Sequence, residues 1–157
     1  MKRFPYLALA LLLASGMAPE KRKDIPKDAT LFHGKYYKVF EKKCSWHEAE
    51  ALCEKTGGRL ASIKSKEEDE FLRKLRAGKC LWFGGSDEAK EGDWRWRDGT
   101  EMAYQNWADG EPDDWKGKED WMVVGWPGGE RFKTGKWGDT ISKYRKQIDG
   151  FMCEWDK

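Results

Sequence analysis

Hydrophobic and polar positions change their spacing along the chain, and each spacing predicts one kind of element. Residues 36–40 combine aromatic and β-branched side chains, which predicts a short strand. Apolar side chains then recur at helical spacing over residues 46–53. Ser45 and Glu48 form the pattern of a capping box at the start of this helix, and the glycines at 57–58 predict its end.

A second helix is predicted by the same signals. Ser65 and Glu68 repeat the capping pattern, apolar side chains at 71, 72 and 75 face inward, and Gly78 stops the helix just after Arg76. Residues 59–63 form a strand that connects the two helices.

The second half of the chain predicts strands separated by loops. Residues 81–83 and 94–96 are the first two strands, and 122–124 and 151–153 close the chain as core strands. Gly, Pro, Asp and Lys interrupt nearly everything from 98 to 138, and no third long helix is expected. The order of elements predicts an α+β fold.

Five carboxylates surround one proline within this loop region. They lie within residues 111–120, and Asp139 follows in the short segment 137–139. A solvated acidic turn is the ordinary interpretation of such a run. However, a structureless region of this length is uncommon in a compact domain unless it is functional or held by a ligand. Ca²⁺ accepts about 6–8 oxygen ligands from irregular loops, so the sequence predicts a calcium site here.

Composition and charge fit one globular domain and exclude some partners. With 157 residues, of which 39% are hydrophobic and ten are tryptophans, the chain can bury one core and has little room for a second. The formal net charge is +2, and removing Lys2 and Arg3 with a leader gives 2 − 2 = 0. Nothing in this balance predicts nucleic-acid binding, and we expect the basic residues within 17–31 to form a flexible tether.

The amino terminus has the pattern of an export signal. Residues 1–3 are positively charged, 6–14 are apolar, and 14–16 offer small residues for cleavage. The apolar run is shorter than the ~20 residues that span a bilayer. We therefore expect residues 1–16 to be a signal peptide, 17–31 the tether and 32–157 the domain of a secreted protein that does not span the membrane after cleavage. Four cysteines fit an oxidising compartment and allow three pairings into two disulfides.

From about Phe32 to Asp156 the chain resembles the C-type lectin-like domain family. The family's motifs occur in their usual order, at residues 45–53, 60–63, 81–84, 91–96, 106–107, 111–113, 137–139 and 151–154. The resemblance implies a double-loop α+β fold, with two helices packed on small antiparallel sheets and a long loop that binds calcium. It also implies a calcium-dependent lectin whose partners are glycans or glycoproteins.

The resemblance assigns two groups of calcium ligands. The sugar-binding site falls on Glu111, Asp113, Glu119, Gly138 and Asp139, of which four have side chains that can ligate. The auxiliary site falls on Asp87, Glu91, Asp114, Glu119 and Asp120, all of which are carboxylates. Oxygen-only ligand sets are the ones expected for this ion.

Sugar preference depends on the residues around Pro112. In the family, Glu-Pro-Asn is associated with mannose-like sugars and Gln-Pro-Asp with galactose-like sugars, whereas residues 111–113 are Glu-Pro-Asp. Trp115 resembles the tryptophan of galactose-type members, which stacks on the apolar face of the sugar ring. The resemblance therefore favours galactose or N-acetylgalactosamine over mannose.

Two departures from the family pattern keep an alternative open. Asp113 and Gly138 stand where the mannose-type pattern has amide side chains that donate to sugar hydroxyls. Losing such a donor costs about 1–3 kcal/mol. The alternative function is a calcium-stabilised domain that binds protein or matrix ligands without recognising sugar.

The resemblance also implies a disulfide between Cys53 and Cys153, joining the first helix to the last strand. The family's second disulfide is missing, because Trp121 occupies the place of its first cysteine. Cys44 and Cys80 are left as a further disulfide, two thiols or an intermolecular bridge.

No sequence pattern predicts catalysis. Glu111 and Glu119 could in principle act as an acid and base pair on a glycosidic bond. Yet the chain has no nucleophile elbow, zinc motif or phosphate loop, and its two histidines, His33 and His47, fit surface or capping roles. We therefore expect a binding protein and not an enzyme.

Overall fold

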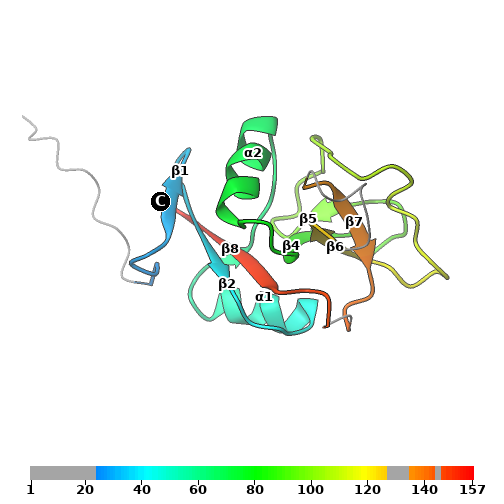
Figure 1. Ribbon diagram of the computed structural model, residues 1–157, viewed down its shortest axis with the longest axis horizontal. Coiled ribbons are helices and arrows are strands. Elements are labelled where there is room, and N and C mark those ends of the chain that lie inside the picture. Colours follow the sequence, from blue (N-terminus) through cyan, green and yellow to red (C-terminus); the bar gives the residue numbers. More distant parts are fainter. Residues whose placement is uncertain (1–23, 127–134, 144–145) are drawn as a thin grey trace, which may run out of the picture.

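The computed structural model describes residues 24–126, 135–143 and 146–157, and Figure 1 shows their arrangement. The expected signal peptide and the first part of the expected tether lie outside them. The described residues form two helices, α1 (Trp46–Glu54) and α2 (Lys66–Leu75). Their strands are β1 (Thr30–Phe32), β2 (Lys35–Phe40), β3 (Arg59–Leu60), β4 (Leu81–Ser86), β5 (Arg95–Trp96), β6 (Trp121–Val124), β7 (Trp137–Thr140) and β8 (Gly150–Asp156).

The strands join in one mixed sheet, in which the two ends of the domain meet. Its order is β1-β2-β8-β4-β6-β7, with β3 added to β8 and β5 added to β4. The last strand, β8, pairs antiparallel with β2 and parallel with β4. The predicted α+β class is confirmed. The strands β1 and β7 were not predicted, because both are short and lie beside turn residues.

The first helix starts and ends as the sequence predicts. The backbone N–H of Ser45 donates to Glu48 Oε2 (2.8 Å), and the N–H of Glu48 donates to Ser45 Oγ (3.3 Å), which completes a capping box. After the helix the chain must pass very close to β8, since a Cβ at Gly58 would lie 2.6 Å from the carbonyl oxygen of Glu154. Glycine is therefore required there by space.

The disulfide between Cys53 and Cys153 is present and joins α1 to β8. The two Cα atoms are 5.7 Å apart and the cysteines are separated by 100 residues. Closing a loop of this length stabilises a fold by about 4–5 kcal/mol in the chain-entropy model. Cys44 and Cys80 are not joined by a disulfide and are both buried in the core that contains α1.

The second helix begins without the reciprocal capping box that its sequence suggests. Ser65 Oγ accepts from the N–H of Glu68 (3.2 Å), as expected. The carboxylate of Glu68, however, is used elsewhere: it accepts from the N–H of Lys64 (2.6 Å) and from the hydroxyl of Tyr37 on β2. A tertiary contact thus replaces the local contact, and it ties α2 to the sheet.

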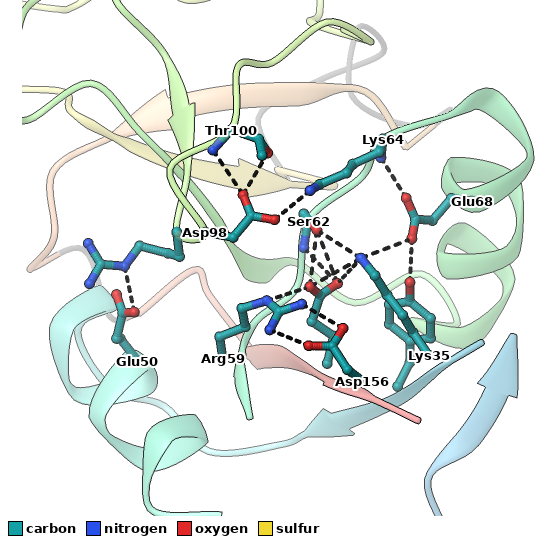
Figure 2. A network of polar contacts seen from close by, with 12 residues as sticks. Lys35, Glu50, Arg59, Ser62, Lys64, Glu68, Asp98, Thr100 and Asp156 are labelled. Carbon is teal, nitrogen blue, oxygen red and sulfur yellow. Dashed lines mark hydrogen bonds and ion pairs between the residues drawn. The ribbon is translucent and has the colours of Figure 1, made fainter. Parts of the chain in front are cut away.

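A buried carboxylate on β8 links three strands, and Figure 2 shows its partners Lys35, Arg59 and Ser62 gathered together. Glu154 on β8 is fully buried, and its oxygens accept from Arg59 Nε (2.8 Å) and Lys35 Nζ (3.2 Å). Ser62 adds its backbone N–H at 3.2 Å. A buried charge costs free energy unless it is paired and hydrogen-bonded, and this one is both.

Tryptophans fill much of the two hydrophobic clusters on either side of the sheet. Trp82 and Trp155 are fully buried, and Trp94 and Trp96 are nearly so. The core also reaches further toward the amino terminus than the expected boundary at Phe32, since Ile25 is buried in it. Neither described helix is long and apolar enough to cross a membrane.

The long loop between β5 and β6 is anchored at its stem to α2 and β7. The side-chain amide of Asn106 donates to the buried carboxylate of Asp69 (2.6 Å), and Lys136 Nζ donates to Asn106 Oδ1 (2.7 Å). On the backbone, the N–H of Trp137 donates to the carbonyl oxygen of Asn106 (3.0 Å). These contacts place the acidic part of the loop beside Asp139 on β7.

Candidate functional site

Three carboxylates converge where the acidic loop meets β7. Oxygens of Glu111, Asp113 and Asp139 all lie within 4.8 Å of one another. They line a pocket of about 220 Å³, which we call the ligand pocket. The other residues lining it are Trp115, Glu119, Trp126, Gly138 and Thr140.

Asp139 holds the loop in place through backbone hydrogen bonds. Its Oδ1 accepts from the N–H of Asp113 (3.1 Å) and its Oδ2 from the N–H of Asp114 (2.8 Å). The N–H of Asp139 points to Glu111 Oε2 at 3.4 Å. The peptide bond between Glu111 and Pro112 is cis. Through these hydrogen bonds, residues on both sides of the proline contact one aspartate, Asp139 on β7.

Glu119 lies in the same pocket and is electrostatically destabilised there. Burial, followed by repulsion from Asp139, raises the pKa of Glu119 to about 7. One of its oxygens accepts from the N–H of Trp115 (3.2 Å), which closes the tip of the loop. A cation between these carboxylates would remove the repulsion and favour their ionised forms.

A second carboxylate cluster lies beside the first and is formed by Asp87, Glu91 and Asp120. Asp87 is only 2% exposed, and its Oδ1 has no hydrogen-bond partner among the described residues. Burial and the neighbouring carboxylates raise the pKa of Asp87 to about 6. Desolvation and repulsion from Asp114 also raise the pKa values of Glu91 and Asp120.

Asp114 lies between the two clusters. Its backbone N–H donates to Asp139, while its Oδ1 accepts from the N–H of Glu119 (3.2 Å). Its charge acts on Glu91 and Asp120. All eight carboxylates that the sequence singled out thus gather in one region of the molecule, in two adjacent groups.

Trp115 lies at the rim of the ligand pocket with 59% of its surface exposed. The ammonium group of Lys116 lies 4.1 Å from the centre of its ring. Because more than half of its surface is exposed, the ring of Trp115 is available to a ligand. Few other large hydrophobic side chains are exposed among the described residues.

Trp126 and Thr140 line the ligand pocket although the sequence did not single them out. Trp126 follows β6, and Thr140 ends β7. No motif marks either residue, and their position depends on the pairing of β6 with β7. Alternation along β7 could have placed Thr140 only if the strand itself had been recognised.

Comparison with known proteins finds a known domain family over the part of the chain that contains the ligand pocket. The profile of the "Lectin C-type domain" family matches residues 42–154. The chain is 29% identical over 155 residues to "Galactose-specific lectin nattectin" of Thalassophryne nattereri, which covers 96% of this chain and 92% of that protein. By contrast, it spans only 17% of the length of rat "C-type lectin domain family 4 member F".

Solved structures with the same fold include carbohydrate-recognition domains and antifreeze proteins. The carbohydrate-recognition domain of cow CD23, solved in the presence of a GlcNAc2Man3 oligosaccharide, matches with a TM-score of 0.75 and 31% identity, over 85% of this chain and 96% of that one. Herring type II antifreeze protein matches with a TM-score of 0.73 and 28% identity, over 85% and 99%.

Proposed function

Because the chain belongs to the C-type lectin domain family, we propose that it is a calcium-dependent carbohydrate-binding protein with a preference for galactose or N-acetylgalactosamine. The observation that carries this proposal is the convergence of Glu111, Asp113 and Asp139 within 4.8 Å, beside the exposed ring of Trp115. The arrangement supplies a site for a hard cation and an apolar surface next to it.

The ligand pocket suits calcium by the chemistry of its donors. Glu111, Asp113, Asp139 and Glu119 offer carboxylate oxygens, and Ca²⁺ takes about 6–8 oxygens in flexible geometry. Carboxylates held this close repel one another, and burial together with repulsion from Asp139 raises the pKa of Glu119. A divalent cation offsets this repulsion, and its coordination positions beyond the protein ligands are open to hydroxyl groups.

The adjacent cluster of Asp87, Glu91 and Asp120, with Asp114 at its edge, is proposed as a second calcium site. The buried Oδ1 of Asp87 has no hydrogen-bond partner in the part of the chain that the structure describes, which supports a ligand role. An ion bound there would hold Asp120 and Asp114 together, on either side of Glu119. The role of this second ion would be to order the loop that carries the ligand pocket. The described part of this loop contains no disulfide.

A calcium ion held by the carboxylates of the ligand pocket would offer further coordination positions to sugar hydroxyl groups. Two neighbouring hydroxyl groups can bind the ion while they donate to Glu111, Asp113 or Glu119, so that ion and sugar share one polar network. Trp115 would stack on the apolar face of the ring. This face is more continuous in galactose than in mannose, which supports the proposed preference.

A second candidate function is the binding of protein or matrix ligands without sugar. It is favoured by Asp113, an acceptor where a donor would serve a sugar hydroxyl, and by Gly138, which offers no side chain. Antifreeze proteins with this fold illustrate that fold alone does not fix the ligand. For either function we propose a secreted binding protein without catalytic activity, whose residues 1–16 are removed as a signal peptide. Of the tether expected at 17–31, Ile25 and the start of β1 pack with the domain expected at 32–157.

Glycan-array binding of the oxidised protein, with calcium and with chelator in parallel, tests the proposal. We expect signal on glycans with terminal galactose or N-acetylgalactosamine, and its loss with chelator. Signal dominated by mannose would reverse the preference. A blank array from a protein whose melting temperature still rises with calcium would favour the second candidate function.

A further inference from the structure

A second hollow lies beside the ligand pocket, on the other side of Pro112. It is a groove of about 500 Å³, larger than the ligand pocket, and we call it the side groove. Its walls include Trp94, Arg95, Glu101, Gln105 and Trp107. The sequence analysis assigned no binding role to any of them.

Alternate residues of the acidic loop face the two hollows. Glu111 and Asp113 line the ligand pocket, whereas Pro112 and Asp114 line the side groove. Pro112 is exposed and so forms the ridge between them. A molecule that is held by the carboxylates of the ligand pocket and extends across this ridge enters the side groove.

One wall of the side groove is built from an ion-paired guanidinium group. Arg95 Nε lies 2.8 Å from Asp93 Oδ1, and Arg95 Nη1 lies 3.5 Å from Glu101 Oε1. The Arg95 side chain remains 41% exposed. An arginine carries five N–H donors, and its carboxylate partners retain acceptor positions. The wall therefore offers donors and acceptors together without an isolated positive charge.

Gln105 adds an adaptable polar group to the same groove. Its Nε2 donates to the carbonyl oxygen of Met102 at 3.1 Å, which fixes the side chain while leaving the amide oxygen and the second N–H on an exposed residue. An amide that can both donate and accept suits a hydroxyl group, which does the same.

Aromatic surface completes the groove. Trp94 and Trp107 meet edge to face, with ring centres 4.7 Å apart and planes inclined by 66°. Trp94 is only 8% exposed, whereas Trp107 is half-buried. Indole rings present flat apolar surface to the C–H face of a sugar ring, while neighbouring polar groups bind its hydroxyls.

We infer that the side groove is a second saccharide subsite, which takes a neutral sugar residue linked to the one held in the ligand pocket. A neutral sugar is favoured because Arg95 is already paired with two carboxylates, so an acidic group would meet their repulsion. The inference rests on the proposed function and adds that the ligand is at least a disaccharide.

Calorimetry with methyl β-galactoside and with neutral galactose-terminated di-, tri- and tetrasaccharides, in calcium, tests the subsite. We expect at least one oligosaccharide to bind the wild-type protein about tenfold more tightly than the monosaccharide. Gln105→Ala and the charge-balanced pair Arg95→Gln with Glu101→Gln should reduce this advantage to about twofold or less while leaving monosaccharide affinity unchanged. Lys66→Ala, on the exposed start of α2, is the matched control and should keep the full advantage.

The outcomes separate the subsite from the function on which it rests. Equal affinity of the wild-type protein for the monosaccharide and every oligosaccharide would overturn the subsite and leave the lectin function standing. An advantage that survives the groove variants would overturn it too. Failure of the wild-type protein to bind any of these sugars would overturn the galactose-type function and, with it, the subsite that rests on it. Circular dichroism of each variant checks that the fold is retained.

Discussion

Asp139 on β7 is bound by the backbone on the far side of Pro112: its Oδ1 accepts from the N–H of Asp113 at 3.1 Å, and its Oδ2 from the N–H of Asp114 at 2.8 Å. One carboxylate thus fixes the loop and also faces Glu111 in the ligand pocket. Loop geometry and the proposed calcium site therefore depend on the same side chain.

Replacing the carboxylate of Asp139 should disturb both the loop geometry and the proposed calcium site. We expect Asp139→Asn to weaken calcium binding about 10–100-fold, because the amide removes a charge and places a donor against one of the two backbone N–H groups. Titration calorimetry measures the affinity directly. Asp109→Asn, an exposed residue on the same loop, is the matched control, and an equal loss there would remove the special role of Asp139.

Calcium affinity should fall as the pH is lowered from 8 to 6. Protons compete with the cation at Glu119, whose pKa is raised to about 7, and at Asp87, whose pKa is raised to about 6. Glu119→Gln should bind calcium more weakly at pH 8 and show a flatter pH dependence. Glu70→Gln, on the exposed surface of α2, should behave as the wild type. Equal pH profiles for wild type and Glu119→Gln would contradict the assignment.

The metal-free protein should show the opposite trend with pH. Between the ordinary value of 4.5 and the raised value of about 7, the folded state binds more protons at Glu119 than the unfolded state does. Its free energy of unfolding therefore decreases as the pH rises through this window. Urea unfolding in chelator at pH 5.5 and 7.5 checks the sign, and Glu119→Gln should reduce the difference between the two values.

Trp115 should contribute to sugar binding and little to folding. Its ring is 59% exposed, so Trp115→Ala should leave the melting temperature and calcium affinity nearly unchanged. Loss of aromatic stacking should weaken galactoside binding about 3–10-fold, in line with about 0.5–1.5 kcal/mol for such contacts. Trp115→Phe, which keeps a flat ring, should retain most of the affinity. Unaltered binding by Trp115→Ala would remove stacking from the account.

Lys35 should stabilise the fold more than Lys38, a similarly half-buried lysine on the same strand whose carboxylate partner is exposed. Its ammonium group lies 3.2 Å from the fully buried carboxylate of Glu154, so Lys35→Met should lower the free energy of unfolding by about 1–3 kcal/mol. Lys38, which pairs with the exposed Asp28 at 2.7 Å, is the matched control. Lys38→Met should cost at most about 1 kcal/mol. Urea unfolding of both variants compares them, and similar losses would mean that burial of Glu154 does not matter.

Local signals in the sequence were sufficient where neighbouring residues form the structure. The capping residues Ser45 and Glu48 and the stop at 57–58 bounded α1 within a few residues. The same signals predicted a reciprocal capping box at α2, which was wrong. The carboxylate of Glu68 accepts from Tyr37, 31 residues away, and not from the backbone N–H of Ser65. Competition between a local and a distant partner cannot be resolved from spacing alone.

The sequence by itself determined the fold class and the family, because both depend on residue types in a fixed order. Through the family resemblance it also predicted the disulfide between Cys53 and Cys153, which is present, and the set of carboxylates proposed as calcium ligands. The tertiary structure brings these carboxylates together in space, since Asp139 reaches Glu111 and Asp113 through the pairing of β6 with β7 and the anchoring of the loop stem on Asp69. It also placed Trp126 and Thr140 in the ligand pocket and separated the side groove from it at Pro112. These relationships join residues distant in the chain, and they form only when the loop packs against the sheet.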